Sequence, residues 1–278
     1  MKLTQKPAIK ALFKSAKKEL TEDPNQRIPV HLTVTTTPKT NVRVPGQRGM
    51  NNISVPYVIP LHHKIHKSIS QAKILLIVPH PTAKYAEIFQ GVEASTKDTF
   101  ADIISVKKFR PKLRKDPLNV GKDFDLIVAD SRIHEEVVEC YDRLSKKISL
   151  RNLTKPFPIR FIQPGKEDDA RDANMFADPD YVKAQVRGLT RSTSVTLPRS
   201  MACEQGAVNL TALVGYLPEN TAKEIEENIH RVANNIVDNL VDGGARSTKT
   251  IHIKSPKTVG LPIWRLEKEG KSLEDEED

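Results

Sequence analysis

Hydroxyl and ammonium groups near the end of the chain have the types and spacing that suit contact with a phosphate backbone. The run 255–260 reads Ser-Pro-Lys-Thr-Val-Gly. The hydroxyls of Thr250 and Thr258 can hydrogen-bond to ribose or phosphate, and the ammonium groups of Lys254 and Lys257 can neutralise phosphates. Solvated lysines at a strand edge are the alternative interpretation of these two lysines.

This run is the exit loop of a predicted strand–helix–strand unit. Residues 208–214 alternate apolar and polar side chains, which indicates a half-buried strand. Pro218 is expected to open a helix, in which Thr221 and Glu224 have the spacing of a capping box. The run 250–254 is the second strand. The helix has an apolar stripe wide enough to face a core, made of Ile225, Ile229, Val232, Ile236 and Leu240.

The unit resembles the C-terminal half of the RNA-binding domain in the ribosomal protein L-one superfamily, where a Thr-(Met/Val)-Gly turn contacts the RNA backbone. The matching turn is Thr258-Val259-Gly260, and Thr250 occupies the family's hydroxyl position. The sequence departs from the family by an insertion of about two residues, Pro256-Lys257, and by Val259, where Met is usual. The resemblance implies that the backbone of Val259 and Gly260 approaches RNA, because glycine has no Cβ in the way and tolerates a positive φ.

A second cationic segment, 38–52, is rich in Pro, Gly, Asn and Arg. Lys39, Arg43 and Arg48 suit phosphate contacts from a long loop. A mobile loop without a ligand is the alternative interpretation of this segment.

Two further elements are predicted at the N-terminus. Residues 7–20 have the periodicity of an amphipathic helix with a basic outer face. Residues 28–36 read as a strand. In this strand the apolar and polar side chains alternate, with Val30, Leu32 and Val34 on one face and His31, Thr33 and Thr35 on the other.

The charge of the chain predicts an anionic partner. The 278 residues carry a net charge of +9, and the pI is about 9.4. The tail 267–278 holds seven acids and two lysines, a net of −5, so residues 1–266 carry +14. Nucleic acid is the commonest partner of so basic a body, and a basic solvated surface is the alternative. Seven acids without apolar periodicity predict a disordered tail.

Cysteine usage and hydropathy exclude other classes. Cys140 and Cys203 lie far apart, which excludes a Cys-rich zinc motif and favours a reducing compartment. No apolar run approaches the roughly 20 residues that a membrane span needs. The cluster His62, His63 and His66 has no carboxylate or Cys nearby to complete a metal site, so a solvated basic turn is the favoured interpretation.

From residue 73 the sequence pattern changes to strands that alternate with helices, and the strands are apolar. This pattern is typical of a layered, Rossmann-like α/β domain. The predicted elements lie at 74–78, 83–91, 103–106, 124–129, 134–146 and 159–162. A polar stretch, 164–179, then returns to the first domain, and a helix at 181–189 and a strand at 192–197 follow.

A Rossmann-like domain raises an enzyme hypothesis, which the motifs argue against. The first turn, 79–82, reads Pro-His-Pro-Thr and lacks the GxGxxG fingerprint, and 121–123 lacks the full phosphate loop. Asp130, Ser131 and His134 could be imagined as a triad, but Asp130 or Ser131 at a helix start is better read as an N-cap. We therefore expect no catalysis, no cofactor and no small-molecule substrate.

The family resemblance extends over roughly residues 24–264. The runs Asp123–Asp130 and Lys155–Ile159 are similar to the family's second, inserted domain, although the glycine-rich loop common before that entry is absent. The resemblance implies a two-domain α/β fold: a discontinuous α+β RNA-binding domain, 1–70 with 165–264, and an inserted Rossmann-like α/β domain, 71–164. The chain crosses between them twice, so a hinge is expected.

Within the family, the runs 123–134 and 180–187 resemble the nucleolar ribosome-biogenesis branch, including its component of the small-subunit processome. The resemblance implies a non-catalytic protein of the nucleolus that binds pre-ribosomal RNA beside other assembly factors. A mature large-subunit stalk protein is one alternative, and a protein-interaction scaffold without direct RNA binding is the other.

Overall fold

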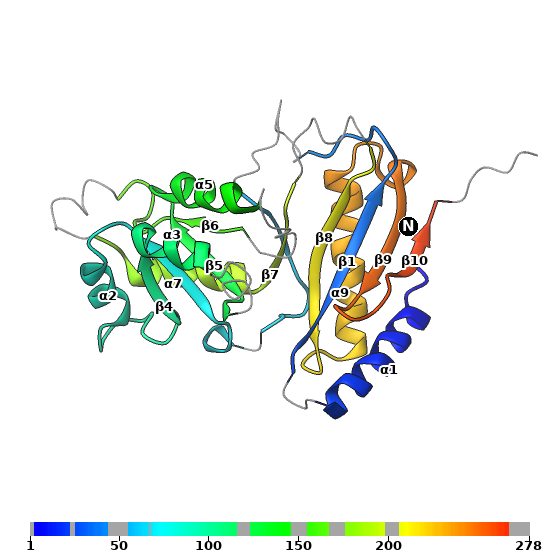
Figure 1. The fold of residues 1–278 in the computed structure, drawn as a ribbon, viewed down its shortest axis with the longest axis horizontal. Helices are drawn as coiled ribbons and strands as arrows, with labels where there is room; N and C mark the ends of the chain where they lie inside the picture. The colour runs from blue at the N-terminus through cyan, green and yellow to red at the C-terminus, as the bar shows by residue number, and fades with distance from the viewer. Residues whose placement is uncertain are drawn as a thin grey trace, which may run out of the picture. The chain divides into compact units, whose positions relative to one another are not determined.

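The computed structural model describes residues 3–22, 26–43, 55–66, 68–115, 123–145, 155–166, 176–197 and 206–266. The chain divides into two compact units, Met1–Asn51 with Leu197–Asp278, and Asn52–Thr196. The fold is mixed α/β, with one antiparallel and one parallel four-stranded sheet (Figure 1). The acidic tail lies outside the described residues.

The unit formed by Met1–Asn51 and Leu197–Asp278 is built on an antiparallel sheet. Its strands lie in the order β10 (Leu261–Arg265), β9 (Thr248–Lys254), β1 (Ile28–Thr36) and β8 (Asn209–Leu217). The helix α9 (Ala222–Asn235) packs against β8 and β1, and Figure 1 shows it behind the sheet. The helix α1 (Lys6–Glu22) contacts α9 and β10.

The start of α9 follows the predicted capping box. The hydroxyl of Thr221 accepts from the N–H of Glu224 at 3.3 Å, and the carboxylate of Glu224 accepts from the N–H of Thr221 at 2.8 Å. The helix begins at Ala222 and not at Pro218, which lies in the turn after β8. All five members of the predicted stripe are buried, and the last two belong to the π-helix η2 (Ile236–Leu240) that continues α9.

The helix α1 also has its expected faces. Ile9, Leu12 and Ala16 are buried, whereas Lys10 and Lys14 are exposed. The N–H of Thr4 donates to the carbonyl of Ile263 at 2.8 Å, which ties the start of the helix to β10. Elsewhere in this unit, the short helix η3 (Gly244–Ser247) follows η2 and leads into β9.

The unit Asn52–Thr196 contains a parallel sheet in the order β4 (Asp102–Ser105), β3 (Ile74–Val78), β5 (Leu126–Asp130) and β6 (Phe157–Ile159). Alternate residues of β3 enter two different cores, because successive side chains of a strand point to opposite faces. Over its described residues, this unit has the α-helices α2 (Thr82–Gln90), α3 (Val106–Lys115), α5 (His134–Ser145) and α7 (Pro179–Thr190).

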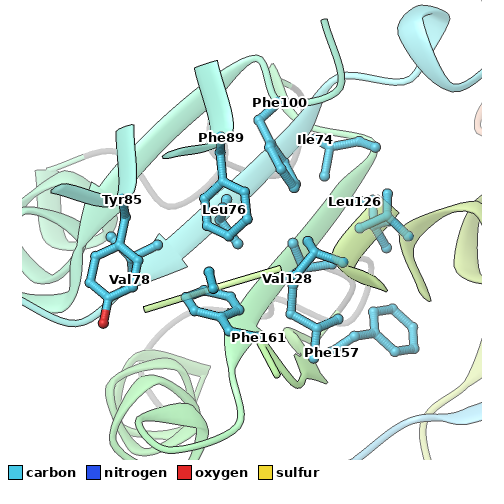
Figure 2. Close-up of a cluster of buried hydrophobic side chains, with 14 of the residues drawn as sticks. Ile74, Leu76, Val78, Tyr85, Phe89, Phe100, Leu126, Val128, Phe157 and Phe161 are labelled. Carbon is cyan, nitrogen blue, oxygen red and sulfur yellow. The ribbon is translucent and has the colours of Figure 1, made fainter. Parts of the chain in front are cut away.

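One core is rich in aromatic rings. Figure 2 shows Ile74, Leu76 and Val78 of β3 beside Tyr85 and Phe89 of α2. Val182 and Val186 of α7 are fully buried in the same cluster. The other core joins Leu75 and Ile77 to side chains of α3 and α5, namely Phe109, Leu113, Val137 and Tyr141.

Two predicted strands of this unit differ in the structure, and two elements of the chain were not predicted. The predicted strand 103–106 ends at Ser105, and Val106 instead begins α3, a helix that the sequence analysis omits. The last strand is Phe157–Ile159 and not 159–162. A further strand of the other unit, β10, also lies beyond the predicted strand–helix–strand pattern.

The compact unit Asn52–Thr196 is wider than the predicted inserted domain, 71–164. The strand β2 (Tyr57–Pro60) pairs with β7 (Ser192–Val195) in a two-stranded antiparallel sheet, after which η1 (Ile69–Gln71) leads into β3. Because α7 buries its apolar face in the core of the parallel sheet, the segments on both sides of the predicted insertion join this unit. The predicted bounds of the functional domains stay a prediction.

Candidate RNA-binding surface

The antiparallel sheet has one face of polar side chains. On β1 the side chains of Ile28, Val30, Leu32 and Val34 are buried toward the core, so His31, Thr33 and Thr35 lie on the other face. Strand pairing extends this face on both sides. Thr35 lies between Asn209 and Thr250, Thr33 between Thr211 and His252, and His31 between Leu213 and Lys254. We call the polar residues of these three rows the polar face: His31, Thr33, Thr35, Asn209, Thr211, Thr250, His252 and Lys254.

Cross-strand hydrogen bonds hold the hydroxyls of this face in place. The hydroxyls of Thr33 and Thr211 lie 3.0 Å apart, and the hydroxyl of Thr35 donates to Oδ1 of Asn209 at 2.7 Å. Such pairs stabilise the register of neighbouring strands. The polar face is therefore organised before any ligand arrives.

Two histidines on this face favour the neutral form. Burial first, and the ammonium group of Lys254 second, lower the pKa of His31 to about 4. The same two causes, in the same order, lower the pKa of His252 from 6.5. A neutral imidazole has one donor and one acceptor nitrogen, so at neutral pH these rings can bond to ribose hydroxyls, while Lys254 supplies the charge.

The hydroxyl of Thr258 closes the turn after β9. It accepts from the N–H of Ser255 at 2.8 Å and from the hydroxyl of Ser255 at 3.1 Å. The N–H of Thr258 in turn donates to the carbonyl of Ser255 at 3.2 Å. Thr258 is half-buried, whereas the side chain of Val259 is 84% exposed. The turn therefore presents Val259 and the backbone around it to solvent, and Thr258 holds its shape.

Gly260 has a packing role that the sequence analysis did not foresee. Its φ lies outside the left-handed region, so the expected tolerance of positive φ is not what the turn uses. A Cβ at this position would lie 2.7 Å from Cδ2 of His252. Glycine thus allows the ring of His252 to lie directly against the turn, which couples the polar face to residues 255–260.

Lys257 has a carboxylate partner in the same unit. Its Nζ lies 3.8 Å from Oε2 of Glu19 on α1. The Glu19 side chain is 10% exposed, whereas the Lys257 side chain is 58% exposed. Lys257 thus reaches solvent, but part of its charge already balances a buried acid.

The predicted loop cations lie at the other end of β1. Lys39 has a left-handed backbone, with φ 64°. Arg43 is held beside the end of η2, where its N–H donates to the carbonyl of Leu240 at 3.0 Å and its guanidinium lies 3.7 Å from Asp242. Arg48 lies outside the described residues.

The structure therefore separates the predicted site residues into two groups. Lys254, Lys257, Thr258, Val259 and Gly260 gather where β9 ends, beside the start of β1. The antiparallel pairing places Thr250 opposite Thr35, toward the end of β1 that leads to Lys39 and Arg43.

His31, Thr33, Thr35 and His252 are candidate site residues that were not predicted from the sequence. Their signal was the polar half of the alternation in β1 and β9, which was read only as evidence for strands. The same signal is present in β8, where the amide of Asn209 and the hydroxyl of Thr211 stand at the polar positions of the alternation.

The residues considered for catalysis are engaged in structural contacts. The carboxylate of Asp130 accepts from the N–H of Arg132 at 2.9 Å and pairs with its guanidinium. Nε2 of His134 lies 2.8 Å from the carbonyl of Pro156, and burial lowers the pKa of this buried ring. These contacts place neither side chain on the hydroxyl of Ser131.

Metal coordination and membrane insertion are two further classes of function. Over the described ranges, 3–266 with their gaps, no group of three or more His, Cys, Asp or Glu side chains could hold a metal ion. No helix in this part of the chain is long and apolar enough to cross a membrane.

Comparison with known proteins gives a consistent family. The chain is 32% identical over 229 residues to the ribosome biogenesis protein UTP30 of Saccharomyces cerevisiae, covering 78% of this chain and 77% of that protein. It is 23% identical over 218 residues to a putative ribosome biogenesis protein of Schizosaccharomyces pombe, covering 78% of this chain and 51% of that longer protein. Residues 12–259, in both compact units, match the ribosomal protein L1p/L10e family, which is the L-one superfamily named above. The chain belongs to this family.

Proposed function

We propose that the protein is a non-catalytic ribosome biogenesis factor that binds structured pre-ribosomal RNA through its polar face. The observation that carries the RNA contact is the register of hydroxyl, imidazole and ammonium groups across β8, β1 and β9. The relatives named as ribosome biogenesis proteins support the cellular role.

The chemistry of the polar face fits the minor groove of an RNA helix. That groove is wide and shallow and displays 2′-hydroxyls, which proteins read with short polar side chains and phosphate contacts. Thr250 and His252 supply short donors and acceptors, and Lys254 supplies a cation at the edge of the turn. Arg43 and Lys39 extend the cationic surface beyond the other end of β1.

The proposed function also specifies the particle in which the protein acts and the arrangement of its domains. The target is an early nucleolar pre-ribosome, the small-subunit processome, where other assembly factors are the neighbours. The parallel sheet belongs to a Rossmann-like domain, residues 71–164. This domain is inserted into the discontinuous RNA-binding domain.

Charge reversal at Lys254 tests the RNA contact. Lys254→Glu should weaken binding of the full chain to several unrelated structured RNAs about equally, because phosphate contacts position an RNA without specifying its sequence. Thr250→Val should cost about fivefold in affinity, the equivalent of one hydrogen bond near 1 kcal/mol. Fluorescence anisotropy at fixed ionic strength measures both.

Lys10→Glu is the matched control, because Lys10 is exposed on α1, away from the polar face. It makes the same change in net charge and should have a smaller effect. Equal affinities of the Lys254→Glu variant and the wild type would remove the polar face from the RNA interface. Failure of the wild type to bind any structured RNA would favour the scaffold alternative.

A further inference from the structure

A cationic groove lies within the unit Asn52–Thr196. Its volume is about 890 Å³, and all its lining residues belong to this unit. Three parts of the chain form its walls: α7, the turns at 91–99 that follow α2, and the described residues 64, 66 and 68–70 around the start of η1. None of the residues proposed above for RNA binding lines it.

The helix α7 turns one face to the core and the opposite face to the groove. Val182 and Val186 are fully buried in the aromatic core. Residues three and four apart share one side of a helix. The groove side follows that spacing and consists of Asp180, Lys183, Ala184, Arg187, Thr190 and, at the C-cap, Arg191.

The groove has more cations than carboxylates. Among the described residues of its lining, the only carboxylates are those of Asp98 and Asp180. Arg187, Arg191 and Lys97 are exposed, and within the described ranges none of them has an ion pair. The five cationic side chains of the lining are Lys64, Lys97, Lys183, Arg187 and Arg191.

The walls are tied together and carry hydroxyls. Nζ of Lys183 donates to the carbonyl of Ser95, which joins α7 to the turns at 91–99. The hydroxyl of Ser95 is buried and has no hydrogen-bond partner in the part of the chain described here. Hydroxyls of Ser68 and Ser70, which also line the groove, lie 3.0 Å apart.

We propose that this groove binds a single RNA strand by its sugar–phosphate backbone. A positively charged groove that follows the backbone is the common feature of proteins that bind single strands without sequence preference. The lining that the structure describes holds no aromatic ring apart from the imidazole of His66, so the proposal does not include stacked bases. Hydroxyls beside cations instead match phosphates and 2′-hydroxyls.

An acidic protein segment fits the groove less well. Protein interfaces depend on a few large side chains buried in apolar pockets. Ile69 is the only large aliphatic residue among the lining residues described. The choice of RNA over another polyanion rests on the proposed function, whereas the cationic character of the site rests on the groove alone.

Photocrosslinking locates the strand. A benzophenone side chain introduced at Ala184, an exposed residue of the groove wall, should crosslink to uridine and adenosine oligonucleotides of about ten residues with similar yield. The control position is Lys108, exposed on α3, which packs on the other face of the parallel sheet. It should give much less crosslinking.

The salt dependence of binding counts the contacts. Arg187→Gln with Arg191→Gln should reduce the slope of log affinity against log salt concentration by about 1.4, since each phosphate contact to a single strand contributes about 0.7. The double variant with lysine at both positions should retain most of the slope. Lys107→Gln with Lys108→Gln removes the same charge elsewhere and should change the slope less.

The outcomes separate this inference from the proposed function. Wild-type binding of structured RNA without crosslinking at Ala184 would overturn the groove and leave the polar face standing. The groove would also be overturned if Lys107→Gln with Lys108→Gln changed the slope as much as Arg187→Gln with Arg191→Gln, because net charge alone would then be responsible. Crosslinking at Ala184 in a Lys254→Glu variant that binds structured RNA normally would support the groove and reject the polar face.

Discussion

At the scale of single residues, the backbone of Gly260 and the ring of His252 are the clearest link between the turn and the polar face. The ring occupies the space that a Cβ would need, and its neighbour Lys254 carries the charge of the surface. The shape of the turn also depends on Thr258, because its hydroxyl accepts a hydrogen bond from the N–H of Ser255. Residues expected to meet RNA directly thus first determine the shape of the turn.

Gly260→Ala should destabilise the protein by about 1–3 kcal/mol, because the new methyl group overpacks against His252. A double variant with His252→Ala should recover much of this loss, since the ring that the methyl group meets is gone. Urea unfolding of both single variants and the double variant gives the coupling energy. Strictly additive costs would show that the ring does not constrain this position.

Protonation of His31 should make stability depend on pH. Its pKa in the folded protein is about 4 against 6.5 for the ordinary side chain, so the unfolded chain takes up a proton first as the pH falls. The full stability is present above about pH 6.5, decreases between 6.5 and 4, and levels off below 4. The total loss from this group is about 3 kcal/mol.

The measurement is the free energy of unfolding from pH 4 to 8 in the wild type and in His31→Gln. The variant should lose less stability over this window. His230→Gln, at an exposed position on α9, is the control. A His31→Gln curve parallel to the wild-type curve would contradict the neutral, buried imidazole.

At the scale of elements, local signals determined which helices and strands could be predicted. Periodicity of two in β1 and of 3.6 in α9 survives because each element has one face in the core. The helix α3 was missed because six of its ten residues are cationic and Pro111 lies inside it, which hides the spacing of Val106, Phe109 and Leu113.

Only part of the candidate site could be predicted, and the reason differs from the one for the helices and strands. The turn at 255–260 is contiguous in the sequence, so its residue types could be read directly. The polar face depends on cross-strand register, in which Thr33 meets Thr211 across 178 positions of the chain. No local pattern specifies that pairing.

The capping box of α9 gives a prediction at this scale. Thr221→Ala should lower the free energy of unfolding by about 1 kcal/mol, because the N–H of Glu224 loses its acceptor. Thr221→Ser keeps the hydroxyl and should be close to the wild type. Thermal unfolding compares the two variants. Equal midpoints for Ala and Ser would mean that the box does not stabilise the helix.

At the scale of the whole molecule, the chain crosses twice between two compact units that both belong to the family match. The polar face lies on one unit and the cationic groove on the other. If both bind RNA as proposed, the chain should bind a long RNA that reaches both sites more tightly than either site alone would. The proposed pair of sites would therefore suit a large folded RNA better than a short isolated helix.

The most direct test of the central claim is crosslinking of the protein to RNA in cells, followed by sequencing of the attached RNA and identification of the crosslinked peptides. The account predicts attachment to pre-ribosomal RNA, including spacer segments absent from mature ribosomes, through peptides that contain residues 31–35 or 250–260. Attachment to mature large-subunit RNA alone would favour the stalk protein. The absence of any attached ribosomal or pre-ribosomal RNA would contradict the account.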